Sequence, residues 1–161
     1  MATHPVHGAV HRYSARCEWR GSTAVGYDAY DRTHRAVAPP AHAALVLAAD
    51  PAFRGNADLL NPEQLLVLAA ASCQLLSFLA VASRARIDVV DYRDDAEGEL
   101  PETEQPMRVT RITLRPHIVV RGEVREERVR HLVEVGHREC YIANSLSAEV
   151  VVEPGIEIRP D

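Results

Sequence analysis

An uncharged, mostly apolar run spans residues 65–83, and it constrains the fold of this chain more than any other feature. Its length approaches the roughly 20 residues that cross a bilayer. However, Ser72, Gln74 and Ser77 interrupt the run, and no aromatic belt marks its ends. We therefore expect a central helix buried on all sides and no membrane span. One small sheet cannot cover so apolar a helix, so we expect a second subunit to cover the rest.

The residues before the run predict where this helix begins. Asn61 can cap a helix, Pro62 fits the first helical position, and Glu63 suits the positive end of the helix dipole. The helix should end near Arg86, and it carries Cys73 about three turns from its start.

Patterns typical of strands lie on both sides of this helix. Residues 10–20 alternate as in a half-buried strand with Cys17 on the inward face, and Pro116 suggests a sheet edge or a bulge. We expect strands at residues 10–20, 23–30, 36–47 (broken by Pro39 and Pro40), 89–100, 109–120 and 150–158, a polar loop at 31–35, and a second helix at 123–139. Strands grouped before helices indicate an α+β fold with an antiparallel-rich sheet, and the length suits a single domain over residues 1–161.

Composition excludes several classes of protein. The chain has 18 basic and 23 acidic residues, so its formal charge of −5 disfavours nucleic acid as a partner. Three cysteines are too few, and odd in number, for a disulfide-stapled secreted domain. The N-terminus lacks the apolar segment of a signal peptide. We therefore expect a cytoplasmic protein.

The three cysteines differ in context. Cys17 is expected to be a small core residue. Cys73 lies too far from the helix start for the dipole to activate it, so it is either a core residue or a thiol activated by a cation from elsewhere. Cys140 continues the apolar stripe of the second helix and faces the same core. The pair is a candidate couple of attacking and resolving cysteines, although the sequence does not set their distance.

Two cysteine contexts carry a resemblance to a known family. Three stretches resemble the OsmC/Ohr family: residues 61–65 (Asn-Pro-Glu-Gln-Leu), the Ala-Ala-Ala-Ser-Cys sequence that ends at Cys73, and residues 140–146 (Cys-Tyr-Ile-Ala-Asn-Ser-Leu). Members of that family are bacterial thiol peroxidases of organic hydroperoxides. Residues 50–56 and 91–98 resemble one OsmC-like branch, and the similarity runs from about residue 13 to residue 154.

This resemblance implies an intertwined homodimer with buried central helices and two sites at the interface. It implies that Cys73 attacks the peroxide and that Cys140 resolves the product as a disulfide. The family also places a glutamate and an arginine beside the attacking thiol. Glu63 matches the glutamate, and Arg32 matches the arginine, with Arg35 as the alternative.

The implied chemistry suits these residue types. A thiolate is the nucleophile, and a guanidinium held by a carboxylate can contact both the thiolate and the peroxide. The sulfenic acid formed at Cys73 condenses with Cys140, and an external dithiol, in the family a lipoylated protein, reopens the disulfide. No cofactor is expected. An apolar pocket would favour organic hydroperoxides over hydrogen peroxide.

Helix geometry adds an inference about the subunits. Glu63 and Cys73 are ten residues apart, which is about 15 Å along one straight helix. We therefore expect Glu63 to serve the Cys73 of the other subunit. The sequence also departs from the family, since Gln74 stands where relatives in this branch often carry histidine, and Tyr30-Asp31-Arg32 replaces a glycine-rich loop.

Two other functions are alternatives to the peroxidase. His137 and Cys140 share a helix face, but no second pair has the spacing of zinc ligands, so we expect no metal. The second alternative is a non-catalytic dimeric module that binds an apolar small molecule while the cysteines only pack. Peroxide should couple Cys73 to Cys140 in the enzyme and leave both thiols unchanged in the binding module.

Overall fold

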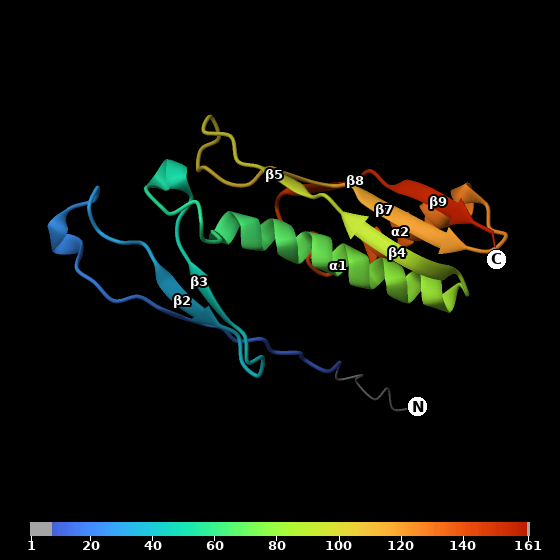
Figure 1. Cartoon of the computed structure of the whole chain (residues 1–161), viewed down its shortest axis with the longest axis horizontal. Coiled ribbons are helices and arrows are strands. Elements are labelled where there is room, and N and C mark those ends of the chain that lie inside the picture. The colour runs from blue at the N-terminus through green and yellow to red at the C-terminus, as the bar shows by residue number, and fades with distance from the viewer. Residues whose placement is uncertain (1–7, 161) are drawn as a thin grey trace, which may run out of the picture. The chain divides into compact units, whose positions relative to one another are not determined.

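The computed structural model describes residues 8–160. The chain divides into two compact units, an N-terminal one that ends at Pro62 and a C-terminal one that begins at Glu63 (Figure 1). The single-domain expectation stays a prediction.

The N-terminal unit is a three-stranded antiparallel sheet with the order β1-β2-β3. Its strands are β1 (Arg16–Glu18), β2 (His34–Val37) and β3 (Ala44–Leu47), and its short 3-10 helices are η1 (Thr23–Val25) and η2 (Pro51–Phe53). Pro39 and Pro40 lie in the turn between β2 and β3, so the strand expected at 36–47 is in fact the end of β2, a turn and β3. The expected loop at 31–35 is wrong at its end, because β2 already begins at His34.

Two expectations for this unit are wrong. Residues 23–30 are not a strand, because Ser22 caps η1 by accepting from the backbone N–H of Ala24, and Gly26 turns the chain at φ 96°. Cys17 is exposed, as is all of β1, rather than buried on an inward face. The alternation of residues 10–20 indicated an extended backbone, but β1 is only three residues long and lacks a buried side.

The C-terminal unit contains two helices and six strands in two sheets. Its elements are α1 (Pro62–Arg84), β4 (Asp88–Asp94), β5 (Glu97–Glu99), β6 (Arg111–Leu114), β7 (Pro116–Arg121), α2 (Glu126–Arg138), η3 (Ala143–Ser145), β8 (Glu149–Val152) and β9 (Gly155–Arg159). Each of the three strands expected after the first helix is broken into two. One half of each joins the sheet β4-β7-β9 and the other half joins the sheet β5-β6-β8.

Strand directions confirm the mixed, antiparallel-rich α+β fold. β4 pairs with β7, and β5 with β6, in antiparallel register. β8 and β9, which follow the crossover through α2, pair in parallel with β6 and β7. Pro116 lies neither at an edge nor at a bulge but at the first residue of β7, the central strand of its sheet, which is a position where a missing backbone donor is tolerated.

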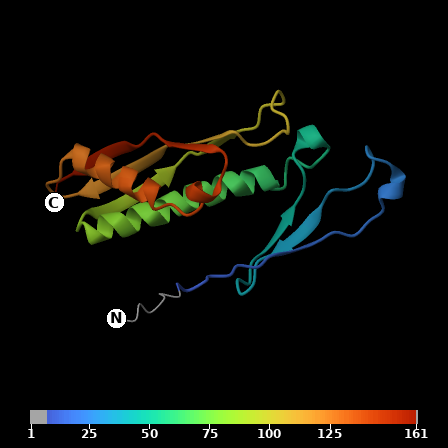
Figure 2. The same cartoon turned by 180° about the vertical axis from the view of Figure 1, so that it is seen from behind.

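Both helices lie on the same side of the β4-β7-β9 sheet (Figure 2). Helix α1 directs one side into the core, with Ala70, Gln74, Phe78, Val81 and Ala82 buried. In the single chain its other side leaves Leu68, Leu76 and Leu79 exposed, so α1 is not buried on all sides. By length and composition α1 could also cross a bilayer, a property that it shares with core helices of globular proteins.

Helix α2 approaches α1 closely at Gly136. A Cβ atom at Gly136 would lie 3.0 Å from the backbone of Phe78. The buried side chain of Gln74 spans the same contact, with Nε2 3.4 Å from the carbonyl of Val133 and Oε1 3.3 Å from Nδ1 of His137. These contacts place the end of α2, and the turn that follows it, beside the middle of α1.

Candidate active site

Cys73 and Cys140 meet in the C-terminal unit. Cys73 lies in the middle of α1, and Cys140 is buried two residues beyond the end of α2. Their side chains hydrogen-bond to each other, and both are free thiols. The sequence predicted that Cys140 faces the core containing Cys73, and the structure places the two sulfur atoms together without a bond.

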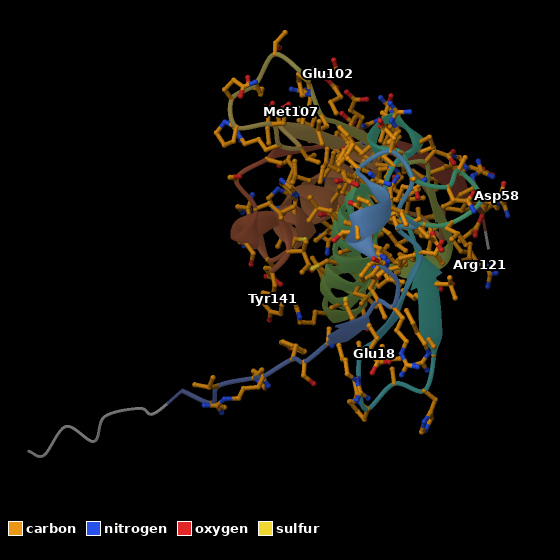
Figure 3. The ribbon with its side chains drawn as sticks, turned by 90° about the vertical axis from the view of Figure 1, so that its left-hand side faces the viewer. Glu18, Asp58, Glu102, Met107, Arg121 and Tyr141 are labelled. Carbon is orange, nitrogen blue, oxygen red and sulfur yellow. The ribbon has the colours of Figure 1, made fainter. Side chains whose placement is uncertain are left out.

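The turn after α2 is held in one conformation by its own hydrogen bonds. The backbone N–H of Cys140 donates to His137 O at 3.1 Å, and that of Asn144 donates to Cys140 O at 3.0 Å. The hydroxyl of Ser145 donates to the carbonyl of Tyr141 at 2.7 Å. The exposed Tyr141 side chain points to solvent (Figure 3). This turn therefore presents its backbone, and not the Tyr141 side chain, to the two sulfur atoms.

Backbone N–H groups of this turn act on Cys73. Burial raises the pKa of the Cys73 thiol, but hydrogen bonds from the backbone of Ile142 and Tyr141, from the Cys140 thiol and from the Ser77 side chain outweigh burial, so the net pKa lies below that of an ordinary thiol. Successive N–H groups pointing into one concavity stabilise an anion. The activation expected from a cation is thus already supplied in part by the backbone.

Cys140 has the opposite character. Burial raises the pKa of its thiol, the backbone N–H of Ala143 at 3.5 Å from the sulfur lowers it, and the neighbouring Cys73 raises it again. The net pKa lies above that of an ordinary thiol. Of the two, Cys73 forms the thiolate more readily and Cys140 stays protonated to higher pH, an order that suits an attacking and a resolving cysteine.

Sequence reasoning missed two polar residues near this pair. Tyr92 and Asp94 lie on β4, and the charges of both Asp94 and Cys140 act on the Tyr92 hydroxyl. Residues two apart on a strand share a face, so the alternation of β4 was the signal that could have found them.

Glu63 lies in the first turn of α1, as expected. Because Glu63 and Cys73 belong to one continuous helix, they are separated by about 15 Å along its axis within a subunit. The structure therefore does not bring Glu63 to the Cys73 of its own chain.

The two candidate arginines belong to the N-terminal unit, so which of them meets Cys73 stays a prediction. The guanidinium of Arg32 lies 3.9 Å from the ring centroid of Tyr30 and 4.8 Å from that of Tyr27. It also donates to the carbonyls of Tyr30 at 2.8 Å and Tyr27 at 2.7 Å. Arg35 instead lies 3.8 Å from the exposed carboxylate of Glu18. Of the two guanidinium groups, only that of Arg32 is held by aromatic rings and backbone carbonyls.

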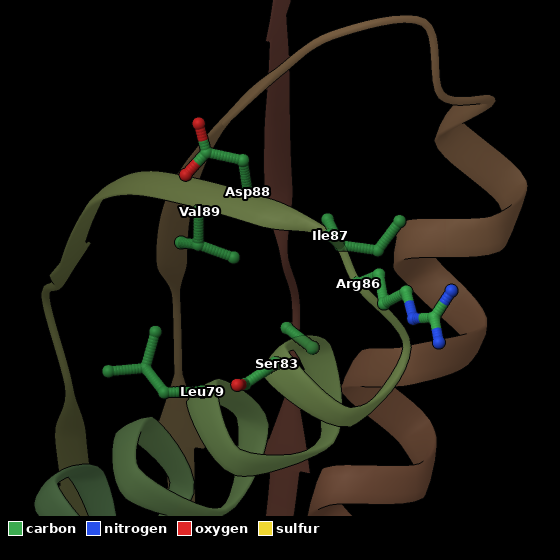
Figure 4. Close-up of a pocket in the computed structure, with 7 residues that line it drawn as sticks. Leu79, Ser83, Arg86, Ile87, Asp88 and Val89 are labelled. Atoms are coloured by element: carbon green, nitrogen blue, oxygen red, sulfur yellow. The ribbon is translucent and has the colours of Figure 1, made fainter.

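A separate pocket of about 400 Å³ lies where α1 ends and β4 begins (Figure 4). It is lined by Leu79, Ala82, Ser83, Arg86, Ile87, Asp88 and Val89, so neither cysteine contributes to it. Within residues 8–160, no group of three or more His, Cys, Asp or Glu side chains could hold a metal ion.

Comparison with solved structures identifies similar folds. An OsmC-like protein of unknown function from Vibrio cholerae is 27% identical with a TM-score of 0.81, and the match covers 90% of this chain and 99% of that one. The organic hydroperoxide resistance protein OhrB of Bacillus subtilis is 18% identical with a TM-score of 0.64, covering 92% and 100%. An organic hydroperoxide resistance protein from Elizabethkingia anophelis is 17% identical with a TM-score of 0.70, covering 94% and 99%.

Sequence comparison gives a consistent result. Among curated proteins none matches the chain. The family model described as OsmC-like protein matches residues 55–154, which include Glu63, Cys73 and Cys140. This match spans more than half of the chain, and the structural neighbours include organic hydroperoxide resistance proteins. The chain is a member of the OsmC/Ohr family, with an OsmC-like fold.

Proposed function

We propose that this protein is a cysteine-based peroxidase that reduces organic hydroperoxides to alcohols. The observation that carries the proposal is the contact between Cys73 and Cys140, two reduced thiols with opposite pKa shifts: hydrogen bonds lower the pKa of Cys73, whereas burial and the neighbouring Cys73 raise that of Cys140. N–H groups directed at the sulfur of Cys73 stabilise its thiolate, which is the nucleophilic form of a cysteine.

In the first step, the Cys73 thiolate attacks the distal oxygen of the hydroperoxide. The S–O bond forms, the O–O bond breaks, and the alkoxide takes a proton to leave as the alcohol. Cys73 is then a sulfenic acid. An alkyl or aryl peroxide is favoured over hydrogen peroxide, because organic hydroperoxide resistance proteins are among the structural neighbours.

In the second step, the sulfur of Cys140 attacks the sulfenic sulfur of Cys73. The S–S bond forms, the S–O bond breaks, and water leaves. An external dithiol, such as that of a lipoylated protein, then reduces the disulfide by exchange. No bound cofactor takes part in these steps.

We further propose that the protein acts as a homodimer in the cytoplasm. The face of α1 that bears Leu68, Leu76 and Leu79 is apolar and exposed in the single chain, and a second copy would remove it from water. Within one chain, Glu63 and Cys73 are separated by about 15 Å along α1, at about 1.5 Å per residue. In the dimer, Glu63 would therefore act on the Cys73 of the other subunit. Arg32 would complete the site.

Peptide mapping after one equivalent of cumene hydroperoxide, without reductant, tests the proposal. We expect a Cys73–Cys140 disulfide in the wild type and in Cys17→Ser, and none in Cys73→Ser. Unmodified thiols in the wild type would overturn it. The remaining function would then be binding of an apolar small molecule, for which the pocket lined by Leu79, Ile87 and Val89 is the candidate.

A further inference from the structure

Gln74 is a polar side chain inside an apolar core. It is completely buried in the C-terminal unit, one residue after Cys73 on α1. Its neighbours on the buried side of α1, Ala70 and Phe78, are apolar. A buried amide needs hydrogen-bond partners, whereas an apolar side chain of similar size would fill the same space without that requirement. The amide therefore calls for a role beyond packing.

Both ends of the Gln74 amide reach α2. The Nε2 atom donates to the carbonyl of Val133 at 3.4 Å, and Oε1 lies 3.3 Å from Nδ1 of the half-buried His137. Val133 and His137 are four residues apart, so they lie one turn from each other on the same face of α2. The close approach of the two helix backbones where Gly136 meets Phe78 brings this face within reach of the amide.

These contacts also specify which nitrogen of His137 carries the proton. A carbonyl oxygen only accepts, so the amide nitrogen of Gln74 faces Val133 and the amide oxygen faces His137. The amide oxygen likewise only accepts, so Nδ1 of His137 must donate to it. The neutral imidazole ring therefore carries its proton on Nδ1 and leaves Nε2 unprotonated.

The same face of α2 leads directly to Cys140. The carbonyl of His137 accepts from the backbone N–H of Cys140 at 3.1 Å, and the Cys140 thiol is hydrogen-bonded to that of Cys73. A chain of contacts thus runs from Gln74, the neighbour of one cysteine, through His137 to the other cysteine. Directional hydrogen bonds select one position of two packed helices along each other, whereas apolar contacts have no preferred direction.

We propose that Gln74 is a positioning residue for the coupling of Cys73 to Cys140: through Val133 and His137 it holds the end of α2 at one position along α1, so that the Cys140 sulfur stays within reach of the sulfenic acid at Cys73. This inference rests on the proposed peroxidase function and deepens its second step. Gln74 touches no reacting atom and adds no reactant. It acts only on the distance between the two sulfur atoms when the S–S bond forms.

Rapid-mixing kinetics of Gln74→Met measure this effect, because methionine is similar in length and cannot hydrogen-bond to both α2 groups. Trapping of the sulfenic acid with dimedone reports the first step, and quenched mass spectrometry of the disulfide reports the second. We expect the second step to slow on the order of 100-fold, the effect of misplacing reacting atoms by about 1 Å. The first step does not require Cys140 and should change less, so the sulfenic acid should accumulate.

His137→Phe tests the same contact from the other helix, at a half-buried position where the fold does not depend on a core amide. We expect it to slow the second step less than Gln74→Met does, because the hydrogen bond to Val133 remains. The double variant should be about as slow as Gln74→Met alone, since the His137 contact is already lost. His131→Phe, at an exposed position beside Glu134 on the same helix, is the control and should change neither step.

The tautomer of His137 gives a spectroscopic readout that a general loss of packing would not produce. Two-bond ¹⁵N–¹H correlation spectra should show the proton on Nδ1 in the wild type and on Nε2, the usual form of a free histidine, in Gln74→Met. A proton on Nε2 in the wild type, unchanged second-step rates in both variants, or equal slowing of both steps would each overturn the positioning role while leaving the peroxidase intact. A wild type that forms no sulfenic acid would instead overturn the proposed function itself.

Discussion

Gly136 faces Phe78 so closely that a Cβ atom on the glycine would lie 3.0 Å from the Cα atom of the phenylalanine. At this point α2 carries no side chain, and the backbones of the two helices approach each other. The contact is four residues before Cys140 and five residues after Cys73 along their respective helices. The contact between Gly136 and Phe78 fixes the spacing of the two helices and therefore limits the distance between the two thiols.

Gly136→Ala should destabilise the protein and slow the coupling of the cysteines. Overpacking a close contact is unfavourable by about 1–3 kcal/mol, and the better helix propensity of alanine offsets at most about 1 kcal/mol of this. Urea unfolding would measure the free energy of unfolding. Gly155→Ala is the control, because its Cβ would meet only the His117 ring at an ordinary 3.6 Å. Equal stability of the two variants would contradict the prediction.

Arg86→Gly should stabilise the protein. Arg86 lies two residues beyond the end of α1 and has φ 59°, a left-handed conformation that is unfavourable for a residue with a Cβ and natural for glycine. We expect a gain of about 1 kcal/mol in the free energy of unfolding. Arg84→Gly, which lies in the last turn of the helix, should have the opposite effect. Thermal unfolding of both variants checks the difference, and a loss of stability in Arg86→Gly would refute the reasoning.

The pH midpoints for alkylation of Cys73 and Cys140 should be shifted in opposite directions from those of ordinary thiols. The lowered pKa of Cys73 keeps a larger thiolate fraction than an ordinary thiol as the pH falls, whereas the raised pKa of Cys140 delays its reaction to higher pH. Relative to the same cysteines in the urea-unfolded chain, the midpoint for iodoacetamide labelling should be lower for Cys73 and higher for Cys140. Ser77→Ala should raise the Cys73 midpoint. Coincident folded and unfolded midpoints would show that the turn does not act on the thiols.

Arg32 and Arg35 should differ in their effect on peroxide reduction. Arg32→Lys removes the stacked guanidinium and should lower kcat/KM for cumene hydroperoxide on the order of 100-fold, the size of effect of one lost electrostatic contact to a transition state. Arg35→Lys keeps a charge beside Glu18 and should stay within about 3-fold. Tyr30→Phe should retain more activity than Tyr30→Leu, because a ring still faces the cation. The reverse order for the two arginines would assign the role to Arg35.

Subunit mixing tests whether Glu63 acts across the dimer. Chains that carry Glu63→Gln and chains that carry Cys73→Ser should each have little activity alone. When they are refolded together, the mixed dimer contains one site with an intact Cys73 and the other subunit's intact Glu63. We expect activity to return in the mixture. If mixing restores nothing although mixed dimers form, Glu63 serves its own chain or has no catalytic role.

Elements with strong local signals were predicted well. The Asn61-Pro62-Glu63 sequence placed the start of α1 at Pro62, where the structure has it, because capping and proline preferences act over a few residues. The buried stripe of α2 was confirmed at Val129 and Val133. Long strands were predicted less well, because a strand that changes sheets at Arg115 shows the same alternation as one that continues.

The sequence by itself determined the residue types of the candidate site, the start of the central helix and the resemblance of the two cysteine contexts to a family. Only the tertiary structure decided that the turn after α2 directs its N–H groups at Cys73, and that Tyr92 lies within the electrostatic reach of Cys140. The reason is physical: periodicity reports which face of an element is apolar, whereas the pKa of a thiol depends on backbone donors and charges that packing brings from distant parts of the chain.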